Sequence, residues 1–262
     1  MEFFTVFLSS LLMVFSPVSL VVDTVVADTI RSRVNDVEEL AVRIDNTPSY
    51  QSTQGKIDRV RIASRGIEPI EDFRIEALEL ETDSIDVNIN NLQTNNIKGI
   101  RQSLRKPLQG GLSLIIKEKD INQALKSDKI RETLQKTINS IVPEQVPKFK
   151  ILTLNVEFKP KNRLGIKVKL QQLKKSDEEN PPETIALNLE AGFKVKDGRS
   201  IQVLDPRGEL NDRTLSKKIL GRFQQFDLAV LEGQGIIARL LKFKVDEESL
   251  ALVSFIRLEP LK

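Results

Sequence analysis

The side chains that could do chemistry in this chain are carboxylates, lysines and arginines, because it contains no cysteine and no histidine. It therefore lacks thiol nucleophiles, imidazole general bases and the usual zinc ligands. The densest carboxylates, Glu76, Glu79, Glu81, Asp83 and Asp86, do not match the spacing of a calcium-binding loop. They alternate with apolar residues, which favours a solvated strand face over a metal site. We predict that the protein binds no metal and no cofactor and is not an enzyme. A carboxylate-based hydrolase is an alternative hypothesis.

A basic set of side chains belongs to the clearest hairpin in the sequence. Apolar residues alternate from Leu152 to Phe158 and again from Leu164 to Leu170. The other face and the turn carry lysine and arginine, and no acid occurs between Phe158 and Ser176. Such a charge run is usually a solvated face, but it also suits anionic lipid headgroups. Our candidates for a headgroup or membrane surface are Lys161, Arg163, Lys167 and Lys169.

Composition argues against a nucleic-acid partner. The formal net charge of +3 is too small to indicate a polyanion ligand by itself. The chain has no tryptophan and one tyrosine, Tyr50, so it has few of the rings on which bases stack. The run from Gly233 to Ala238 matches a dinucleotide-binding loop, but a strand is expected after it where that loop requires a helix.

The first residues form an apolar segment. Residues 3–22 are almost wholly apolar, and their length is close to the ~20 residues that span a bilayer. A retained membrane contact, a cleaved signal and a buried core helix are all compatible with this segment. The only charge before it is Glu2, whereas Arg31 and Arg33 follow it, which favours a cytoplasmic body. We expect an apolar segment at 1–22 and one domain at 23–262. The protein should be membrane-associated, in the cell envelope if the segment is a signal and otherwise at the cytoplasmic face.

The element that organises the rest runs from Gly110 to Pro143. Leu112, Leu114 and Ile116 share one face of a strand, and a helical period begins directly after them. A second helix should follow near Asp128. Earlier in the chain, Val26, Ile30, Val34 and Val37 recur at helical spacing. The change of apolar parity between Ile75 and Leu78 predicts a bulge.

Three stretches together resemble one known family. They are residues 49–62, the run from Arg74 to Thr82, and the run from Leu114 to Leu125. In these stretches the chain is similar to the LmeA-type phospholipid-binding family. The resemblance implies an elongated α+β fold, with a curved antiparallel sheet and long amphipathic helices enclosing an apolar groove, and kinship with tubular lipid-binding proteins. Lys117 stands where the family often has a threonine at a helix start, so we expect a weak cap there.

The resemblance leads to a non-enzymatic phospholipid-binding or transfer protein that acts at a membrane surface. Aliphatic strands under helices can leave a groove for acyl chains, and burial of each CH2 contributes about 0.8 kcal/mol. The same residues could instead pack on one another, which would give a membrane-anchored structural or scaffold protein with a closed core. The groove candidates are Val60, Ile62, Leu78, Leu80, Leu112, Leu114, Ile116, Leu154, Val156, Ile166 and Val168.

Overall fold

The computed structural model describes residues 23–91, 97–141, 148–173, 183–221 and 225–261, and most of them belong to two antiparallel sheets. The first sheet has, in order, β1 (Asp36–Asp45), β3 (Arg59–Ile70), β4 (Phe73–Thr82), β6 (Leu108–Lys117), β14 (Ser249–Leu258) and β13 (Ile236–Val245). The second has β11 (Arg213–Thr214), β10 (Ser200–Leu210), β9 (Thr184–Lys196), β8 (Arg163–Gln172) and β7 (Phe149–Lys159), and β12 (Gln225–Asp227) also pairs with β10. A small third sheet joins β2 (Lys56–Ile57) to β5 (Ile85–Asp86).

The helices of the described chain are short, so the prediction of long amphipathic helices is wrong. They are α2 (Asp23–Arg31), α3 (Ile97–Ser103), α4 (Glu118–Ala124), α5 (Asp128–Ile141) and α6 (Lys217–Leu220). Three 3-10 helices are η2 (Ser49–Gln54), η3 (Ile89–Asn91) and η4 (Leu228–Gln234). The longest helix, α5, has 14 residues. Helix α2 ends before Val34, because the chain turns there and begins β1. The helical spacing of Val34 and Val37 therefore did not indicate a helix, since two residues three apart also fit a turn followed by a strand.

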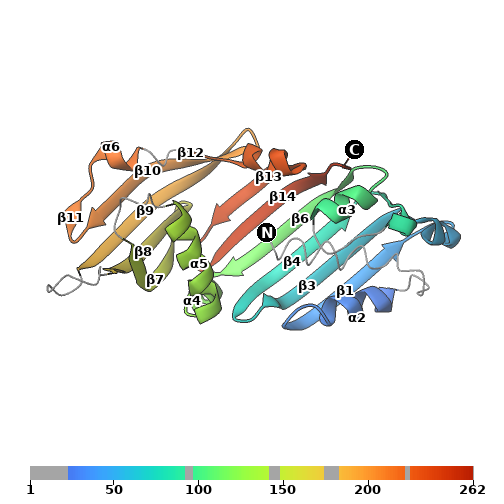
Figure 1. The fold of residues 1–262 in the computed structure, drawn as a ribbon, viewed down its shortest axis with the longest axis horizontal. Helices are drawn as coiled ribbons and strands as arrows, with labels where there is room; N and C mark the ends of the chain where they lie inside the picture. Colours follow the sequence, from blue (N-terminus) through green and yellow to red (C-terminus); the bar gives the residue numbers. More distant parts are fainter. Residues whose placement is uncertain (1–22, 92–96, 142–147, 174–182, 222–224, 262) are drawn as a thin grey trace.

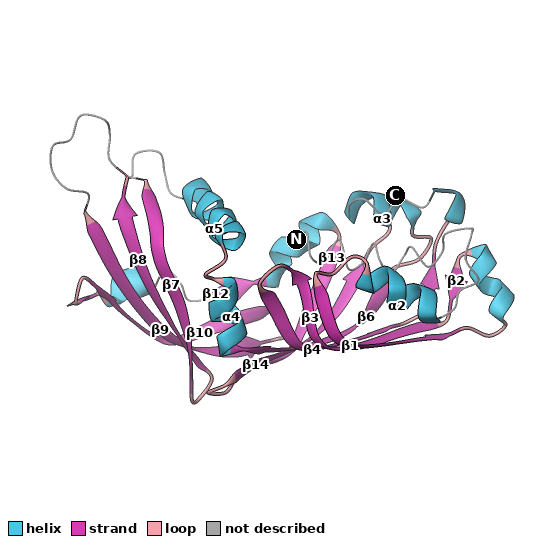
Figure 2. Ribbon diagram, turned by 90° about the horizontal axis from the view of Figure 1, so that it is seen from below, coloured by secondary structure: helices cyan, strands magenta, loops and turns pink. Residues whose placement is uncertain are grey.

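The two large sheets lie side by side along the long axis of an elongated molecule (Figure 1). Seen from below, they curve, and helices α2, α3 and α5 lie on the concave side (Figure 2). The main core lies on the concave side of the first sheet, between the sheet and helices α2 and α3. It combines Val26 and Ile30 of α2 with Val60 and Ile62 of β3. The curved antiparallel sheet that the resemblance implies is therefore present, but it is the strands rather than the helices that dominate the fold.

Several local predictions are confirmed. Strand β6 passes directly into α4, and α5 follows after a short turn. The Lys117 side chain makes no capping hydrogen bond at the start of α4, as expected. The basic hairpin corresponds to β7 and β8, and the run after Gly235 is strand β13 rather than a helix. The bulge is misplaced, however: β4 pairs regularly through Leu78, and the register shift lies between Ile67 and Ile70 of β3.

Candidate functional site

Seven of the groove candidates lie on one face of the first sheet. Ile62 pairs with Leu80, and Leu80 pairs in turn with Leu112. Leu78 likewise pairs with Leu114. Because directly paired residues of antiparallel strands share a face, as do residues two apart in one strand, the shared face also includes Val60 and Ile116. The face comprises Val60, Ile62, Leu78, Leu80, Leu112, Leu114 and Ile116.

Burial divides these seven residues into two groups. Val60, Ile62 and Leu78 are 0%, 2% and 1% exposed, so protein atoms cover them completely. Leu80, Leu112, Leu114 and Ile116 are only partly buried and pack against the edge of that core. In the first sheet, then, one part of the apolar face forms a closed core, and the other part remains accessible.

The other four candidates share the apolar face of the second sheet. Leu154 pairs with Val168, and Val156 pairs with Ile166. All four are partly buried. The two rows continue into β9, where Val168 pairs with Leu187 and Ile166 pairs with Leu189. The second sheet thus presents an aliphatic surface that the described chain leaves partly open.

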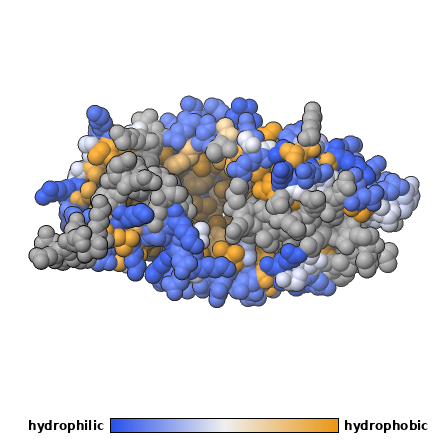
Figure 3. Space-filling view, in the orientation of Figure 1, coloured by the Kyte–Doolittle hydropathy of each residue, from blue (hydrophilic) through white to orange (hydrophobic). Residues whose placement is uncertain are grey.

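Two phenylalanines join the apolar faces of the two sheets. Phe243 pairs with Leu252, which pairs with Leu114, so Phe243 belongs to the face of the first sheet. Phe193 lies two residues from Ala191, which pairs with Leu164 on the face of the second. The ring centroids of Phe193 and Phe243 are 5.8 Å apart. The two faces are therefore continuous, and Figure 3 shows a hollow with a hydrophobic floor near the place where the sheets meet.

The side chain of Asn162, in the β7–β8 turn, holds this junction in place. Its amide nitrogen donates to the carbonyl oxygens of Phe193 and Phe243, the latter at 3.3 Å, and its oxygen accepts from the Val245 amide at 2.6 Å. Asn162 has a φ of 60°, a conformation that asparagine adopts more readily than most residues. The sequence marks this position only as a turn, and nothing in the pattern identifies its partners.

Helices α4 and α5 are attached to the free edge of β7 by side chains. The Asn122 amide accepts from the Val156 N–H at 2.8 Å and donates to the Val156 carbonyl at 2.7 Å. Gln135 accepts from the Ile151 N–H at 2.8 Å and donates to the Phe149 carbonyl. The Glu118 carboxylate accepts from the Phe158 N–H at 2.6 Å. These bonds satisfy strand groups at an edge where no further strand pairs in the described sheet.

An ion-pair cluster connects α4 to the first sheet. Arg74 lies 2.8 Å from Glu38, 2.5 Å from Glu76 and 3.2 Å from Asp120, and Lys117 lies 2.9 Å from Glu76. Hydrogen bonds from Arg74 and Lys117 lower the pKa of Glu76 to about 2. Its carboxylate is thus held ionised by two cations. In the described residues no group of three or more Asp and Glu is arranged to hold a metal ion.

Of the four basic candidates, Arg163, Lys167 and Lys169 lie on the face opposite to the aliphatic rows, and Lys161 lies in the β7–β8 turn. Two of the four have partners. Arg163 bonds Glu190 at 2.8 Å, and Lys167 pairs with Glu157. Arg163 and Lys159 together lower the pKa of Glu190, with Lys159 the larger influence. Lys161 and Lys169 are exposed, and neither forms an ion pair within the described chain. Lys161 and Lys169 are therefore the two candidates available to an external anion.

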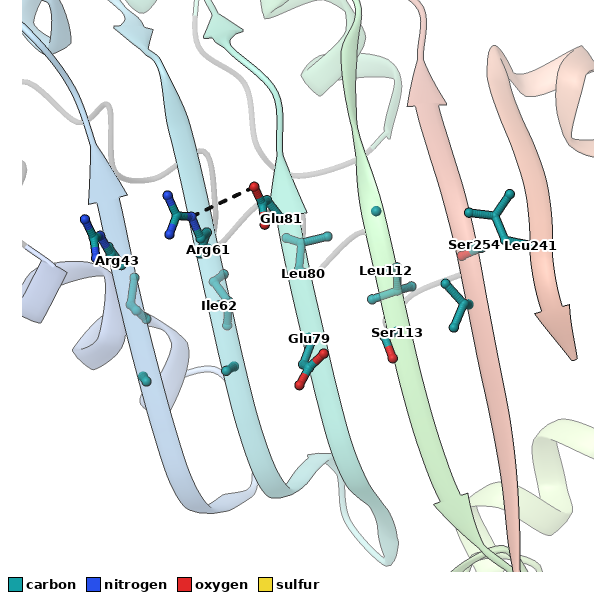
Figure 4. Close-up of a pocket in the computed structure, with 15 residues that line it drawn as sticks. Arg43, Arg61, Ile62, Glu79, Leu80, Glu81, Leu112, Ser113, Leu241 and Ser254 are labelled. Atoms are coloured by element: carbon teal, nitrogen blue, oxygen red, sulfur yellow. Dashed lines mark ion pairs between the residues drawn. The ribbon is translucent and has the colours of Figure 1, made fainter. Parts of the chain in front are cut away.

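A separate hollow of about 450 Å³ crosses β1, β3, β4, β6 and β14 (Figure 4). Its lining includes Arg61 and Glu81, which pair at 3.9 Å. Ile62 and Ser254 in the same lining are buried, whereas Ala63 and Gly111 are exposed. The hollow therefore opens on the outer, charged face of the sheet. Three groove candidates, Ile62, Leu80 and Leu112, are also in its lining, where they alternate with residues of the outer face.

Comparison with known proteins gives one positive result. No curated protein and no solved structure matches the chain. In the described residues no helix has both the length and the hydropathy that crossing a membrane requires. The family model described as LmeA-like phospholipid-binding matches residues 16–254, which span both sheets. The chain therefore belongs to the LmeA-like phospholipid-binding family.

Proposed function

We propose that residues 23–262 act as one domain that binds phospholipid without chemical conversion, with acyl chains lying along the apolar face shared by the two sheets. The observation that carries the proposal is the continuity of that face across Phe193 and Phe243. Acyl chains need no hydrogen-bond partner, and each CH2 removed from water contributes about 0.8 kcal/mol. The partly exposed residues Leu114, Ile116, Val156 and Val168 form the walls of this groove.

The proposed setting is a membrane surface, where a protein with such a groove takes up or delivers lipid. Phospholipid is the partner that the family description names. Binding rather than catalysis fits the side chains available, because the chain has no histidine and no cysteine. Lys161 and Lys169 are the proposed contacts with anionic headgroups, since Arg163 and Lys167 already pair with Glu190 and Glu157.

The first test is mass spectrometry of an organic extract of the purified protein. The proposal predicts phospholipid in the extract from the wild type. Val156→Phe should then reduce the bound lipid and leave the melting temperature nearly unchanged, because a larger ring at a groove wall occupies the place of an acyl chain. The matched control is Thr153→Phe, on an exposed position of the same strand, which should keep the wild-type amount of lipid.

The alternative, a scaffold with a closed core, predicts the opposite pair of results. Overpacking of a closed core costs about 1–3 kcal/mol, so Val156→Phe would lower the melting temperature clearly. A wild type without lipid, together with that loss of stability, would overturn the proposal.

A further inference from the structure

The second sheet contains a small cavity on its apolar face, and of the groove candidates its lining includes only Ile166. Its volume is about 160 Å³. Its floor comes from three neighbouring strands, in which Leu164 pairs with Ala191, Ile166 pairs with Leu189, and Phe193 pairs with Val203. The floor residues are Leu164, Ile166, Leu189, Ala191, Phe193 and Val203.

Leu220 and Phe226 line the side of the cavity toward β10 and β12. Phe226 of β12 pairs with Ile201, which lies two residues before Val203 and so shares its face. Leu220 of α6 is 7% exposed. Gly208 makes its close approach possible, because a Cβ on Gly208 would lie 2.9 Å from Leu189 Cδ2 and 3.1 Å from Leu220 Cδ2. On this side the cavity is therefore bounded by one buried and one partly exposed apolar side chain.

The cavity also borders the junction of the two sheets. Phe193 lines the cavity, and its ring contacts Phe243 of the first sheet. The two charged residues in the lining, Glu190 of β9 and Arg207 of β10, are directly opposite each other in the strand register. Glu190 alternates with Leu189 and Ala191, so both charged side chains belong to the opposite face, where Glu190 bonds Arg163. The interior is thus aliphatic and aromatic.

We propose that this cavity holds the methyl end of one acyl chain of the bound phospholipid, an assignment that rests on the proposed function. A chain end carries only CH2 and CH3 groups, which an apolar cavity accommodates without an unsatisfied polar group. Because Leu220 and Phe226 line the side toward β10 and β12, they limit how far that acyl chain can extend in this direction. The cavity therefore selects among phospholipids by chain length.

Filling the cavity tests this assignment in one direction. The protein is incubated with a mixture of phosphatidylcholines of graded acyl-chain length, repurified and extracted, and the bound species are identified by mass spectrometry. Ala191→Leu should shift the bound distribution toward shorter chains while the total bound lipid stays near the wild-type amount. The matched control, Ala63→Leu, places the same change on an exposed position outside the apolar face and should leave the distribution unchanged.

Opening the cavity tests it in the other direction. Phe226→Ala removes part of the wall on this side and should admit longer chains. Phe226 is 53% exposed, so this variant keeps the test decisive even where Ala191→Leu does not fold. Bound lipid with the wild-type chain-length distribution in both variants would overturn the cavity assignment alone. A wild type that takes up no phospholipid would instead overturn the proposed function on which the assignment rests.

Discussion

The two sheets carry the same alternation of aliphatic residues, yet their apolar faces differ in how completely they are covered. In the first sheet Val60, Ile62 and Leu78 are at most 2% exposed. Helix α2 adds Val26 and Ile30 to the cluster that holds them. In the second sheet Val156, Ile166 and Val168 stay partly exposed, and α4 and α5 bond the edge of β7. An aliphatic strand is thus fully buried or partly exposed according to what packs above it.

The largest expected effect comes from truncating one leucine in each region. Leu78→Ala should lower the free energy of unfolding by about 2–5 kcal/mol, because it leaves a cavity in a closed core. Leu187→Ala, on the partly exposed face of the second sheet, should cost clearly less, since that side chain is only partly buried. Urea denaturation of both variants, after lipid extraction, measures the difference. Equal losses would mean that the second sheet is as closed as the first.

The next effect concerns the attachment of α4 to the second sheet. Asn122→Ala removes both hydrogen bonds to Val156 and leaves the strand N–H and C=O without those partners. Loss of the partner of a buried polar group costs about 1–3 kcal/mol. The unfolding free energy should fall by that amount, whereas Asn155→Ala, at an exposed position of β7, should change it little. A near-neutral Asn122→Ala would show that the helix is held mainly by other contacts.

Acid should weaken the cluster between α4 and the first sheet. The pKa of Glu76 is about 2 in the folded protein and 4.5 as its ordinary value. The ionised carboxylate therefore contributes stability that is complete above pH 4.5 and is lost as the pH falls toward about 2. In Glu76→Gln this part of the acid loss should disappear, so denaturation curves across that range should fall less steeply than those of the wild type. Parallel curves for the two proteins would exclude this role for Glu76.

The smallest effect is expected on the outer face of the second sheet. Changing Lys161 and Lys169 to glutamate should weaken sedimentation with anionic vesicles, since each basic residue near such a surface contributes about 1 kcal/mol. Added salt should weaken wild-type binding in the same way. Changing Lys167 instead breaks its pair with Glu157, so it should affect stability more than binding. If vesicle binding by the double variant equals that of the wild type, this hairpin face is only solvated.

The strands were easier to predict from the sequence than the helices. Period-two alternation identified the β7–β8 hairpin and the face shared by Leu80 and Leu112. This works because successive side chains in a strand point to opposite faces of the sheet. The predicted helix lengths were wrong where a short apolar run fits both the helical and the strand period. Val34 and Val37 were assigned to the helix that ends at Arg31.

Contacts between distant residues left no signal in the pattern. Phe193 and Phe243 belong to different sheets, and Asn122 reaches Val156 across separate elements. Which aliphatic residues are covered also depends on tertiary packing. The sequence therefore predicted the aliphatic face but not which of its residues are fully buried and which stay partly exposed.

The amides of Asn122 and Gln135 have a consequence for assembly as well as for stability. Strand β7 ends its sheet, and an unpaired edge strand can template the addition of a strand from another molecule. The two side chains occupy backbone groups of Val156, Ile151 and Phe149 that an incoming strand would otherwise bond. A molecule that lost α4 and α5 from this edge would be open to strand-by-strand polymerisation. The same amides that anchor two helices thus also occupy the edge at which another copy could add a strand.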